Sequence, residues 1–389
     1  MNQGQTVFAQ LMRMVSHDEF RRCVERYEGN RSVRRMSCWD QFLAMSFAQL
    51  TYRESLRDIA VCLEAQGSKL YHAGFRCAVK RSTLADANEG RDWRIYADLA
   101  QSLIALARPL YADTDLGLDL DATVYALDAT TIDLCLALFP WAHFRRAKGA
   151  VKLHTLLDLQ GAIPVFIHVS HGKMHDVRVL DLLTIEPGAF VVMDRAYVDF
   201  ERLYRLHQSL SFFVVRGKRN LQFRRRYSQS FDPATGVRGD QTIVLTGPKS
   251  STLYPDPLRR VSYYAADIDK RFVFLTNNFT IAAPTVAALY RYRWQVELFF
   301  KWIKQHLRIK RFYGTSANSV KTQVWIAVAV YVLVAIMKRR LDLPHPLYTI
   351  LQVLSLTLFE KTPIPHVFSR IDDSSLVEVP SNQLELFEY

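Results

Sequence analysis

The sequence lacks paired cysteines, and this disfavours two common ways of holding a fold together. Its five cysteines form an odd set, and none of them stands in a C-x-x-C arrangement with another. A disulfide framework and a structural zinc site are therefore both unexpected. We expect a protein of a reducing cytoplasm.

Long apolar runs are also scarce. The longest extends from Val324 to Met337, which is shorter than the roughly 20 residues that cross a bilayer. We expect a buried helix there and no membrane partner. The N-terminal stretch MNQGQTVFAQLMRMVSHDEF has no apolar segment followed by a small-residue cleavage site, so we expect no secretory signal.

Acidic residues are outnumbered by basic ones. The chain has 50 Lys and Arg against 38 Asp and Glu, which gives a net charge of +12. This excess favours a polyanionic partner such as nucleic acid, with a membrane surface as the alternative. With 389 residues, 49% of them hydrophobic, the chain can form two or three folded domains.

A helical pattern covers the first part of the chain. Apolar residues recur at spacings of three and four from Phe8 to about Tyr111, which predicts an all-helical N-terminal domain over residues 1–118. A basic segment inside it is typical of a helix-turn-helix-like DNA reader, and the alternative is a helical bundle with a solvated basic face. The bases of this segment are Arg76, Lys80, Arg81, Arg91 and Arg94.

The pattern changes from helical to strand-like near residue 120. Three strands are expected over residues 124–134, 151–161 and 162–170, and then a helix over 176–186. A strand at 189–197, a helix at 200–210 and a strand at 211–217 follow. This is the strand order of an RNase H-like core. We predict an α/β fold in which residues 119–216 form the first part of that core.

The following segment, residues 217–283, is rich in glycine, proline and β-forming residues, and we interpret it as a mainly β insertion. Helical periodicity then returns. Residues 284–335 are expected to complete the catalytic core, and residues 336–389 to form a helical C-terminal region and tail.

One carboxylate stands among bases and aromatics in the stretch YRYRWQVELFFKWIKQ. If this stretch is one helix, with about 100° per residue, Tyr290, Arg293, Glu297 and Lys304 share a face. Glu297 then lies on a cationic face that is suited to phosphate, since Arg offers phosphate a two-pronged contact and Lys a point charge.

Two further acids occupy the expected strands. Asp128 lies on the first strand, and Asp194 lies at the end of the fourth, where α/β sheets build their sites. Together with Glu297 they could hold a pair of Mg²⁺ ions, with Mn²⁺ as a substitute, and so act on a phosphodiester. The histidines His168, His171 and His175 have no accompanying cysteine, which disfavours zinc.

These residues resemble the insertion sequence 4 family of DDE transposases. The spacing of Tyr290, Arg293, Glu297 and Lys304 matches the family's Y-R-E-K signature, and Asp128 in LDAT and Asp194 in DRAY match the other acids of its catalytic triad. The resemblance extends over about residues 30–355. It implies an RNase H-like catalytic domain with a β-strand insertion between the second and third acids.

The resemblance also implies functions. Asp128, Asp194 and Glu297 would be catalytic metal ligands, and Tyr290, Arg293 and Lys304 would contact phosphates of the transposon end. The expected enzyme is bacterial and nucleoid-associated. It would bind terminal inverted repeats as a homodimer, cleave the DNA in a metal-dependent reaction and join the 3′ end to target DNA. His175 and Asp176 would orient the active-site loop.

Other bases near the core are expected to contact the DNA backbone without sequence preference. Those we select are Lys152, Arg216, Lys218 and Arg81. Some members of the family stack a tryptophan of the insertion on a flipped base during a hairpin step. This insertion has no Trp, so Tyr263, Tyr264 or Phe272 would have to substitute.

Two alternatives stay open. An RNase H-like DNA nuclease would cut without strand transfer. A domesticated transposase would bind DNA but would be catalytically silent, although all the signature residues are present.

Overall fold

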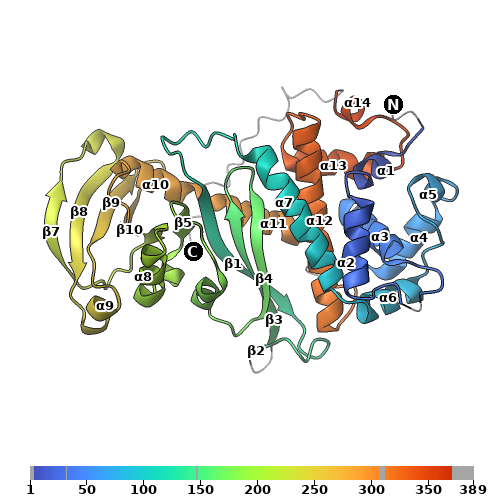
Figure 1. Cartoon of the computed structure of the whole chain (residues 1–389), viewed down its shortest axis with the longest axis horizontal. Coiled ribbons are helices and arrows are strands. Elements are labelled where there is room, and N and C mark those ends of the chain that lie inside the picture. Colours follow the sequence, from blue (N-terminus) through green and yellow to red (C-terminus); the bar gives the residue numbers. More distant parts are fainter. Residues whose placement is uncertain (1–3, 32, 146–147, 306–311, 370–389) are drawn as a thin grey trace. The chain divides into compact units, whose positions relative to one another are not determined.

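The chain divides into two compact units, each assembled from segments that are distant in the sequence. The computed structural model describes residues 4–31, 33–145, 148–305 and 312–369. Of these residues, 4–31, 33–112, 132–145, 148–151, 300–305 and 312–369 form the first unit, and 113–131 and 152–299 form the second. Figure 1 shows the elements of both units along the chain.

The first unit is mainly helical, at both its N-terminal and its C-terminal parts. Its N-terminal helices are α1 (Val7–Met12), α2 (His17–Arg26), α3 (Cys38–Leu50), α4 (Leu56–Glu64), α5 (Lys69–His72), α6 (Arg81–Gly90) and α7 (Arg94–Tyr111). The C-terminal helices are α12 (Ala317–Arg340), α13 (Leu347–Thr357) and α14 (Ile364–Phe368). The predictions of a helical N-terminal region and a helical C-terminal region are confirmed over the described residues; residues 370–389 of the predicted C-terminal region lie outside them.

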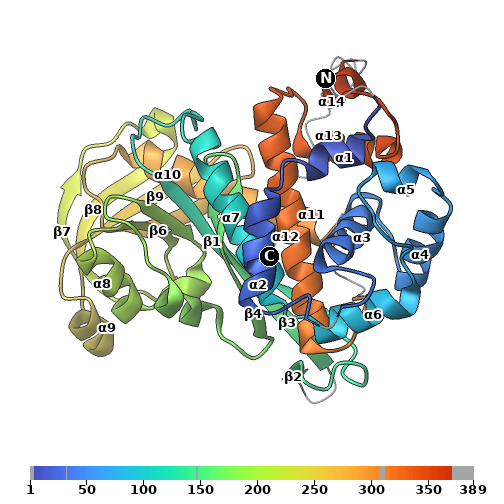
Figure 2. The same ribbon diagram turned by 45° about the vertical axis from the view of Figure 1, so that its right-hand side comes forward.

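Helix α12 forms the centre of the first unit. It is long and apolar enough to cross a membrane by length and composition, but 94% of its most apolar window is buried inside the protein. It packs against α3, α6, α7 and α13, and Figures 1 and 2 both show α7 and α12 side by side. Every residue from Val324 to Met337 is buried. The prediction of a buried helix at this run is confirmed.

A mixed sheet forms the framework for the site. Its strands are β1 (Val124–Leu134), β2 (His143–Arg145), β3 (Lys148–Asp158), β4 (Ile163–His171), β5 (Phe190–Met193), β6 (Phe212–Arg216), β7 (Phe223–Gln229), β8 (Val237–Leu245), β9 (Leu258–Ala265) and β10 (Lys270–Thr276). The sheet has ten strands in the order β2-β3-β1-β5-β6-β10-β9-β8-β7, and β4 pairs with β3. The central strands β1, β5 and β6 are parallel. The mixed α/β class is therefore as predicted.

The segment predicted as a β insertion continues this sheet instead of forming a separate layer. Its last strand, β10, pairs antiparallel with β6, with Phe274 opposite Arg216. Strands β9, β8 and β7 follow outward, each antiparallel to its neighbour. A short helix, α9 (Pro248–Leu253), and a 3₁₀ turn, η3 (Pro233–Thr235), connect the strands. The insertion thus reaches the centre of the sheet through backbone hydrogen bonds.

Short helices cover one face of the parallel strands. They are η1 (Asp176–Leu182), η2 (Arg195–Tyr197) and α8 (Phe200–Gln208). In α8, Asp199 accepts the Arg202 backbone N–H at the first turn, and buried Leu203 joins the core beneath the sheet. The helix expected over 176–186 is instead a 3₁₀ helix that ends at Leu182. His175 gives it no side-chain cap, and β-branched residues such as Val177 and Val179 weaken an α-helix.

The expected signature helix is divided into two helices at Arg293. α10 (Ala283–Tyr292) packs against β5, β6, β8 and β9, and α11 (Trp294–Gln305) follows at once. At the junction, the Arg293 N–H donates to the Tyr290 carbonyl, 3.2 Å away, and the Val296 N–H donates to the Arg293 carbonyl, 3.1 Å away. Both hydrogen bonds join residues three positions apart, as in a 3₁₀ turn, and this tightens the backbone at the junction. The prediction of one unbroken helix was wrong at this residue.

Candidate active site

Two acids of the expected triad follow paired positions on neighbouring strands. In the parallel pair β1 and β5, Leu127 lies opposite Met193. Asp128 comes directly after Leu127, and Asp194 comes directly after Met193. The register of the two strands therefore sets the two acids side by side. Leu127 and Met193 are fully buried, and the alternation of strand side chains turns the two acids to the other face.

The junction between α10 and α11 contributes the other polar side chains. Arg293 bridges two acids, with Nη1 2.6 Å from Asp128 Oδ2 and Nη2 2.5 Å from Glu297 Oε1. The Tyr290 hydroxyl donates to Asp194 Oδ1 over 3.1 Å. Asp128, Asp194 and Glu297, all predicted as catalytic, are therefore joined through two signature side chains in the second unit.

Burial and the neighbouring charges shift the pKa values of Asp128 and Arg293. Burial raises the pKa of Asp128 to about 6, against the opposing effects of Arg293 and the Ala129 N–H, and with smaller contributions from Glu297 and Asp194. Burial acts to lower the pKa of Arg293, but Tyr290, Asp128 and Glu297 outweigh it and hold that pKa above its ordinary value. The guanidinium is therefore charged and compensates part of the carboxylate charge.

The donor chemistry of this group fits a divalent cation, although Arg293 stands between two of the donors. Carboxylate oxygens are the ligands that Mg²⁺ and Mn²⁺ prefer. Both Asp194 and Glu297 raise the pKa of Asp128, as carboxylates that share a site do. Within the residues that the structure describes, no three His, Cys, Asp or Glu side chains already form a group that could hold a metal ion.

A second tyrosine near the acids, Tyr197, has a buried hydroxyl. Tyr197 follows Asp194 in η2 and is 1% exposed, and its hydroxyl has no hydrogen-bond partner in the described chain. Burial raises its pKa, and the neighbouring Asp128, Asp176 and Asp194 contribute to the increase. Our sequence interpretation missed Tyr197. Its position in DRAY, three residues after a predicted catalytic acid, is the signal that could have identified it.

Lys152 is held inside the fold. Its ammonium group donates to the Met174 carbonyl at 3.0 Å and pairs with Asp176 at 2.9 Å. Asp176 also lies 3.9 Å from Nδ1 of His154, a fully buried histidine whose Nε2 is 2.9 Å from the Ser170 hydroxyl. Asp176 thus connects strand β3 to the start of η1.

The other predicted DNA contacts lie in different surroundings. The Arg216 guanidinium lies 5.1 Å from the centre of the Phe272 ring, and Lys218 donates to the Val198 carbonyl at 3.1 Å. Lys304 is half-buried near the end of α11, in the first unit. Arg81 is exposed at the first position of α6. Within the second unit, the structure therefore brings Tyr290 and Arg293 into contact with the acids.

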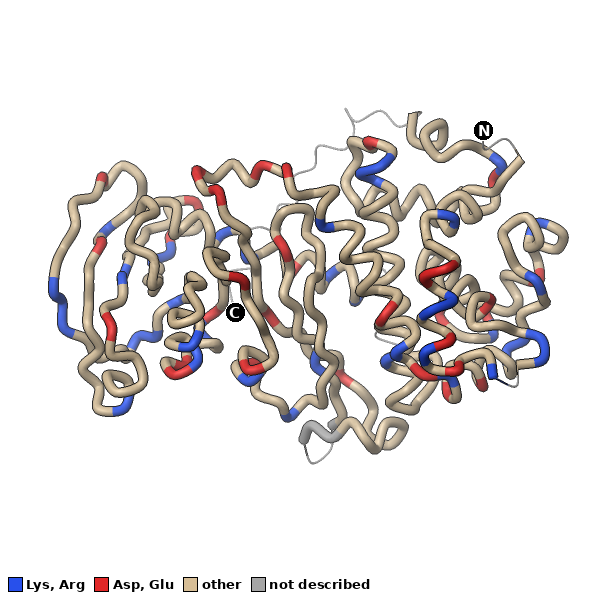
Figure 3. Tube along the Cα trace, viewed as in Figure 1, with Lys and Arg blue, Asp and Glu red and all other residues tan. Residues whose placement is uncertain are grey.

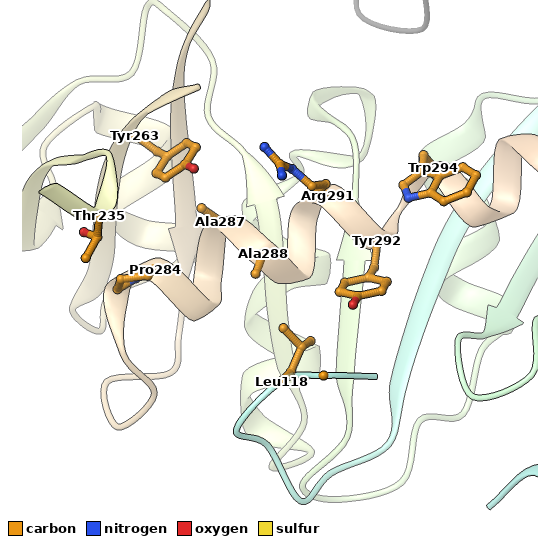
Figure 4. A pocket seen from close by; sticks show the side chains of 10 residues that line it. Leu118, Thr235, Tyr263, Pro284, Ala287, Ala288, Arg291, Tyr292 and Trp294 are labelled. Carbon is orange, nitrogen blue, oxygen red and sulfur yellow. The ribbon is translucent and has the colours of Figure 1, made fainter. Parts of the chain in front are cut away.

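A pocket of about 530 Å³ lies along α10 in the second unit. Figure 4 shows its aromatic side chains, Tyr263 from β9 and Tyr292 and Trp294 from the α10–α11 junction, together with Arg291. Gly236, beside the pocket residue Thr235, has a φ of +86°, and a Cβ there would lie 2.8 Å from the Tyr263 ring. Glycine at this position therefore allows the Tyr263 ring to approach the backbone closely.

Comparison with known families identifies the class of protein. Residues 119–333 match the family described as the transposase DDE domain, and residues 3–76 match a domain of unknown function, DUF4372. The transposase match covers more than half of the chain. The chain belongs to the transposase DDE domain family, and is thus a transposase, an enzyme that cleaves and transfers DNA.

Named relatives place it among transposases of insertion sequences. It is 31% identical to the protein named transposase y4zB of Sinorhizobium fredii, over 72% of this chain and 78% of that one. It is 32% identical to the transposase named for insertion sequence element IS5377 of Geobacillus stearothermophilus, over 53% of this chain and 54% of the relative. The resemblance drawn from the Y-R-E-K signature is confirmed.

Among solved structures, the chain is similar to the piggyBac transposase in a synaptic complex with hairpin DNA. The TM-score is 0.49 and the sequence identity is 9%, over 95% of this chain and 81% of that one.

Proposed function

We propose that this transposase binds the terminal inverted repeats of an insertion sequence, cleaves the DNA at the ends of the element and joins the 3′ ends to target DNA. The observation that carries the proposal is the group formed by Asp128, Asp194 and Glu297 around Arg293 and Tyr290. Three carboxylates joined in this way are the donor set that metal-dependent phosphodiester chemistry requires.

The strand arrangement supports an RNase H-like core. The parallel strands β1, β5 and β6 lie between β3 and the added strand β10. Asp128 lies on β1, and Asp194 directly follows β5. The proposed domain limits stay as predicted: 1–118 for DNA binding, 119–216 and 284–335 for the catalytic core, 217–283 for the insertion and 336–389 for the C-terminal region.

Asp128, Asp194 and Glu297 would hold two Mg²⁺ ions, or Mn²⁺ in their place. Bound metal would activate water or a 3′-hydroxyl and stabilise the leaving oxygen. The chain's own groups would set the geometry: paired strands fix the two aspartates, and Tyr290 orients Asp194 through its hydroxyl. Arg293 would contact the phosphate once it leaves the carboxylates, and Lys304 would add a point charge.

The basic residues near the core differ in how free they are to bind DNA. Arg81 is exposed and makes no ion pair within the described residues, so it is free to bind a phosphate. Lys152 and Lys218 already bind protein oxygens and would have to exchange partners. Strand β7 is a better basic surface than either lysine. Its exposed bases are Arg224, Arg225 and Arg226, and Figure 3 shows the basic run on this outer strand.

The N-terminal helices also present a basic surface with aromatic rings. A pocket of about 430 Å³ is lined by Arg13, His17, Trp39 and Arg76, among other residues, and by no acid. The His17 and Trp39 rings lie 4.4 Å apart, and neither arginine makes an ion pair in the described part of the chain. Cationic and aromatic groups without acids are the combination that nucleic acid binders use.

A hairpin step would need an aromatic residue that can receive a flipped base. Of the substitutes considered, Tyr263 lines the pocket along α10, whereas Tyr264 donates to Asp269 and Phe272 is buried beneath Arg216. Tyr263 is therefore the best-placed stacking residue.

The test is a reaction with the element's own terminal repeats. A labelled end duplex and a target plasmid are incubated with the protein and Mg²⁺, and cleaved and joined products are separated on a gel. We expect cleavage at the repeat and joining of a precut 3′ end to the plasmid, as an assembled dimer. Cleavage without joining would indicate the nuclease alternative, and metal-independent binding without cleavage would indicate a silent DNA-binding protein.

A further inference from the structure

The guanidinium of Arg293 occupies the position between two carboxylates where a cation would bind. One of its terminal nitrogens contacts Asp128 at 2.6 Å and the other contacts Glu297 at 2.5 Å. The Arg293 side chain is 15% exposed, and it comes from the same signature as Glu297. Both contacts are charge-assisted hydrogen bonds, which are stronger than neutral ones.

The arrangement is nevertheless incomplete as a permanent structural bridge. The third nitrogen, Nε of Arg293, is buried and has no hydrogen-bond partner in the described chain. One guanidinium also faces three carboxylates, since among the described residues the Asp194 carboxylate receives the neutral hydroxyl of Tyr290 and no ion pair. The group therefore keeps a negative excess that attracts further cations.

We propose that Arg293 is an internal substitute for the catalytic cations. In DNA-free protein it holds Asp128 and Glu297 and competes with divalent ions, so the protein binds metal weakly. When a DNA phosphate enters, the guanidinium turns to it and leaves both carboxylates to the metal. The inference rests on the proposed function and adds the regulation of the same site.

The surroundings of Arg293 allow such an exchange without refolding. Arg293 lies between the last residue of α10 and the first residue of α11, so movement of the side chain alone can change its partners. Its guanidinium lies 5.6 Å from the centre of the Tyr290 ring, and this face can support the cation as it turns. Phosphate accepts the same two-pronged contact that the two acids accept now.

The exchange couples DNA binding to metal binding. A ligand that removes Arg293 from the acids must strengthen metal binding, and by reciprocity metal must strengthen DNA binding by the same factor. The protein is thereby prevented from activating metal before DNA is present.

The coupling can be tested by titrating the full-length protein with Mn²⁺ without DNA and measuring free Mn²⁺ by electron paramagnetic resonance. We expect Arg293→Gln to bind Mn²⁺ at least tenfold more tightly than the wild type. The single ammonium group of Arg293→Lys cannot bridge both acids in the same way. The Mn²⁺ affinity of this variant should therefore lie between those of the wild type and Arg293→Gln. Circular dichroism and thermal unfolding verify that each variant is folded.

A matched control removes another arginine that bridges two acids. Arg202 binds Asp181 and Asp199 in the same unit, so Arg202→Gln makes the same change in net charge. We expect no gain in Mn²⁺ affinity for Arg202→Gln. An equal gain in this control, or an unchanged affinity in Arg293→Gln, overturns the substitute role.

Two further measurements separate this inference from the proposed function. In the double variant Asp128→Asn with Arg293→Gln, the gain in Mn²⁺ affinity should disappear. Adding an end duplex should increase the affinity of the wild type more than that of Arg293→Gln. If Mn²⁺ binding is the same with and without Asp128 in every background, the proposed metal site itself fails.

Discussion

The hydroxyl of Tyr290 donates a hydrogen bond to Asp194 Oδ1 over 3.1 Å, joining the end of α10 to the end of β5. The Tyr290 ring is buried, with its centre 4.8 Å from that of Phe274. Its pKa is raised to about 12, mainly by burial, so the hydroxyl remains a donor at neutral pH. Tyr290 therefore holds Asp194 in one orientation.

Removing only this hydroxyl should impair catalysis and leave the fold intact. Tyr290→Phe keeps the ring and loses a hydrogen bond to a charged group, which contributes about 1.5–3 kcal/mol. We expect strand cleavage under single-turnover conditions to slow by about ten- to hundredfold. Tyr27→Phe is the matched control, because the Tyr27 hydroxyl binds Asp98 at 3.2 Å in the other unit. Equal rates for the wild type and Tyr290→Phe would show that the contact has no catalytic role.

A buried ion pair fixes the insertion to the loop before α10. Asp240 and Arg259 are each 3% exposed and are joined by hydrogen bonds of 2.9 and 2.7 Å, and Arg259 also donates to the Ile281 carbonyl. Asp240→Asn leaves a buried charge without its partner, and we expect a loss of about 3–5 kcal/mol in the free energy of unfolding.

Urea denaturation measures this loss. The double variant Asp240→Leu with Arg259→Met should recover much of it, because two apolar side chains leave no unpaired charge. Asp267→Asn breaks the exposed pair with Arg291 and should change stability by about 1 kcal/mol or less. A loss as small for Asp240→Asn as for Asp267→Asn would contradict the structural role of the buried pair.

The buried His154 should make stability depend on pH. Burial lowers its pKa from 6.5 to about 4, so between these values the unfolded chain binds a proton that the folded chain does not. Stability is therefore fully present above pH 6.5 and is lost as the pH falls toward 4. At about 1.4 kcal/mol per pH unit, the wild type should lose about 2 kcal/mol more than His154→Gln between pH 7 and pH 5.

Urea denaturation at the two pH values gives this difference directly. His72→Gln, which removes an exposed histidine, should show the same pH dependence as the wild type. If His154→Gln also behaves like the wild type, His154 does not titrate in the manner described.

The sequence predicted what depends on local pattern. Strand β1 was expected over 124–134 and has these limits, because β-branched residues and an aromatic residue in this segment favour a strand. The Y-R-E-K spacing identified the family, since four residue types at fixed distances are specific. The break at Arg293 depends on packing and hydrogen bonds that no local pattern contains.

The contacts of the site could not be read from the sequence. Helical spacing predicted that Arg293 and Glu297 lie on one face, and they do contact each other. That Arg293 also reaches Asp128 depends on how α10 packs on the sheet. The pairing of Lys152 with Asp176 likewise follows from tertiary structure, because a basic residue on a strand is equally compatible with a free cation. Tyr197 was missed because its unusual feature, a buried hydroxyl without a hydrogen-bond partner among the described residues, exists only in the folded chain.

The central claim is that Asp128, Asp194 and Glu297 together hold the metal ions that cleave DNA. Single-turnover cleavage of an end duplex with Mg²⁺ tests it most directly, using Asp128→Asn, Asp194→Asn and Glu297→Gln. Asp181→Asn and Glu201→Gln remove acids of the same unit that lie in surface ion pairs with arginines and serve as controls. We predict that each of the three variants loses cleavage by about a thousandfold or more and that both controls retain it. Cleavage near the wild-type rate in any one of the three would contradict the account.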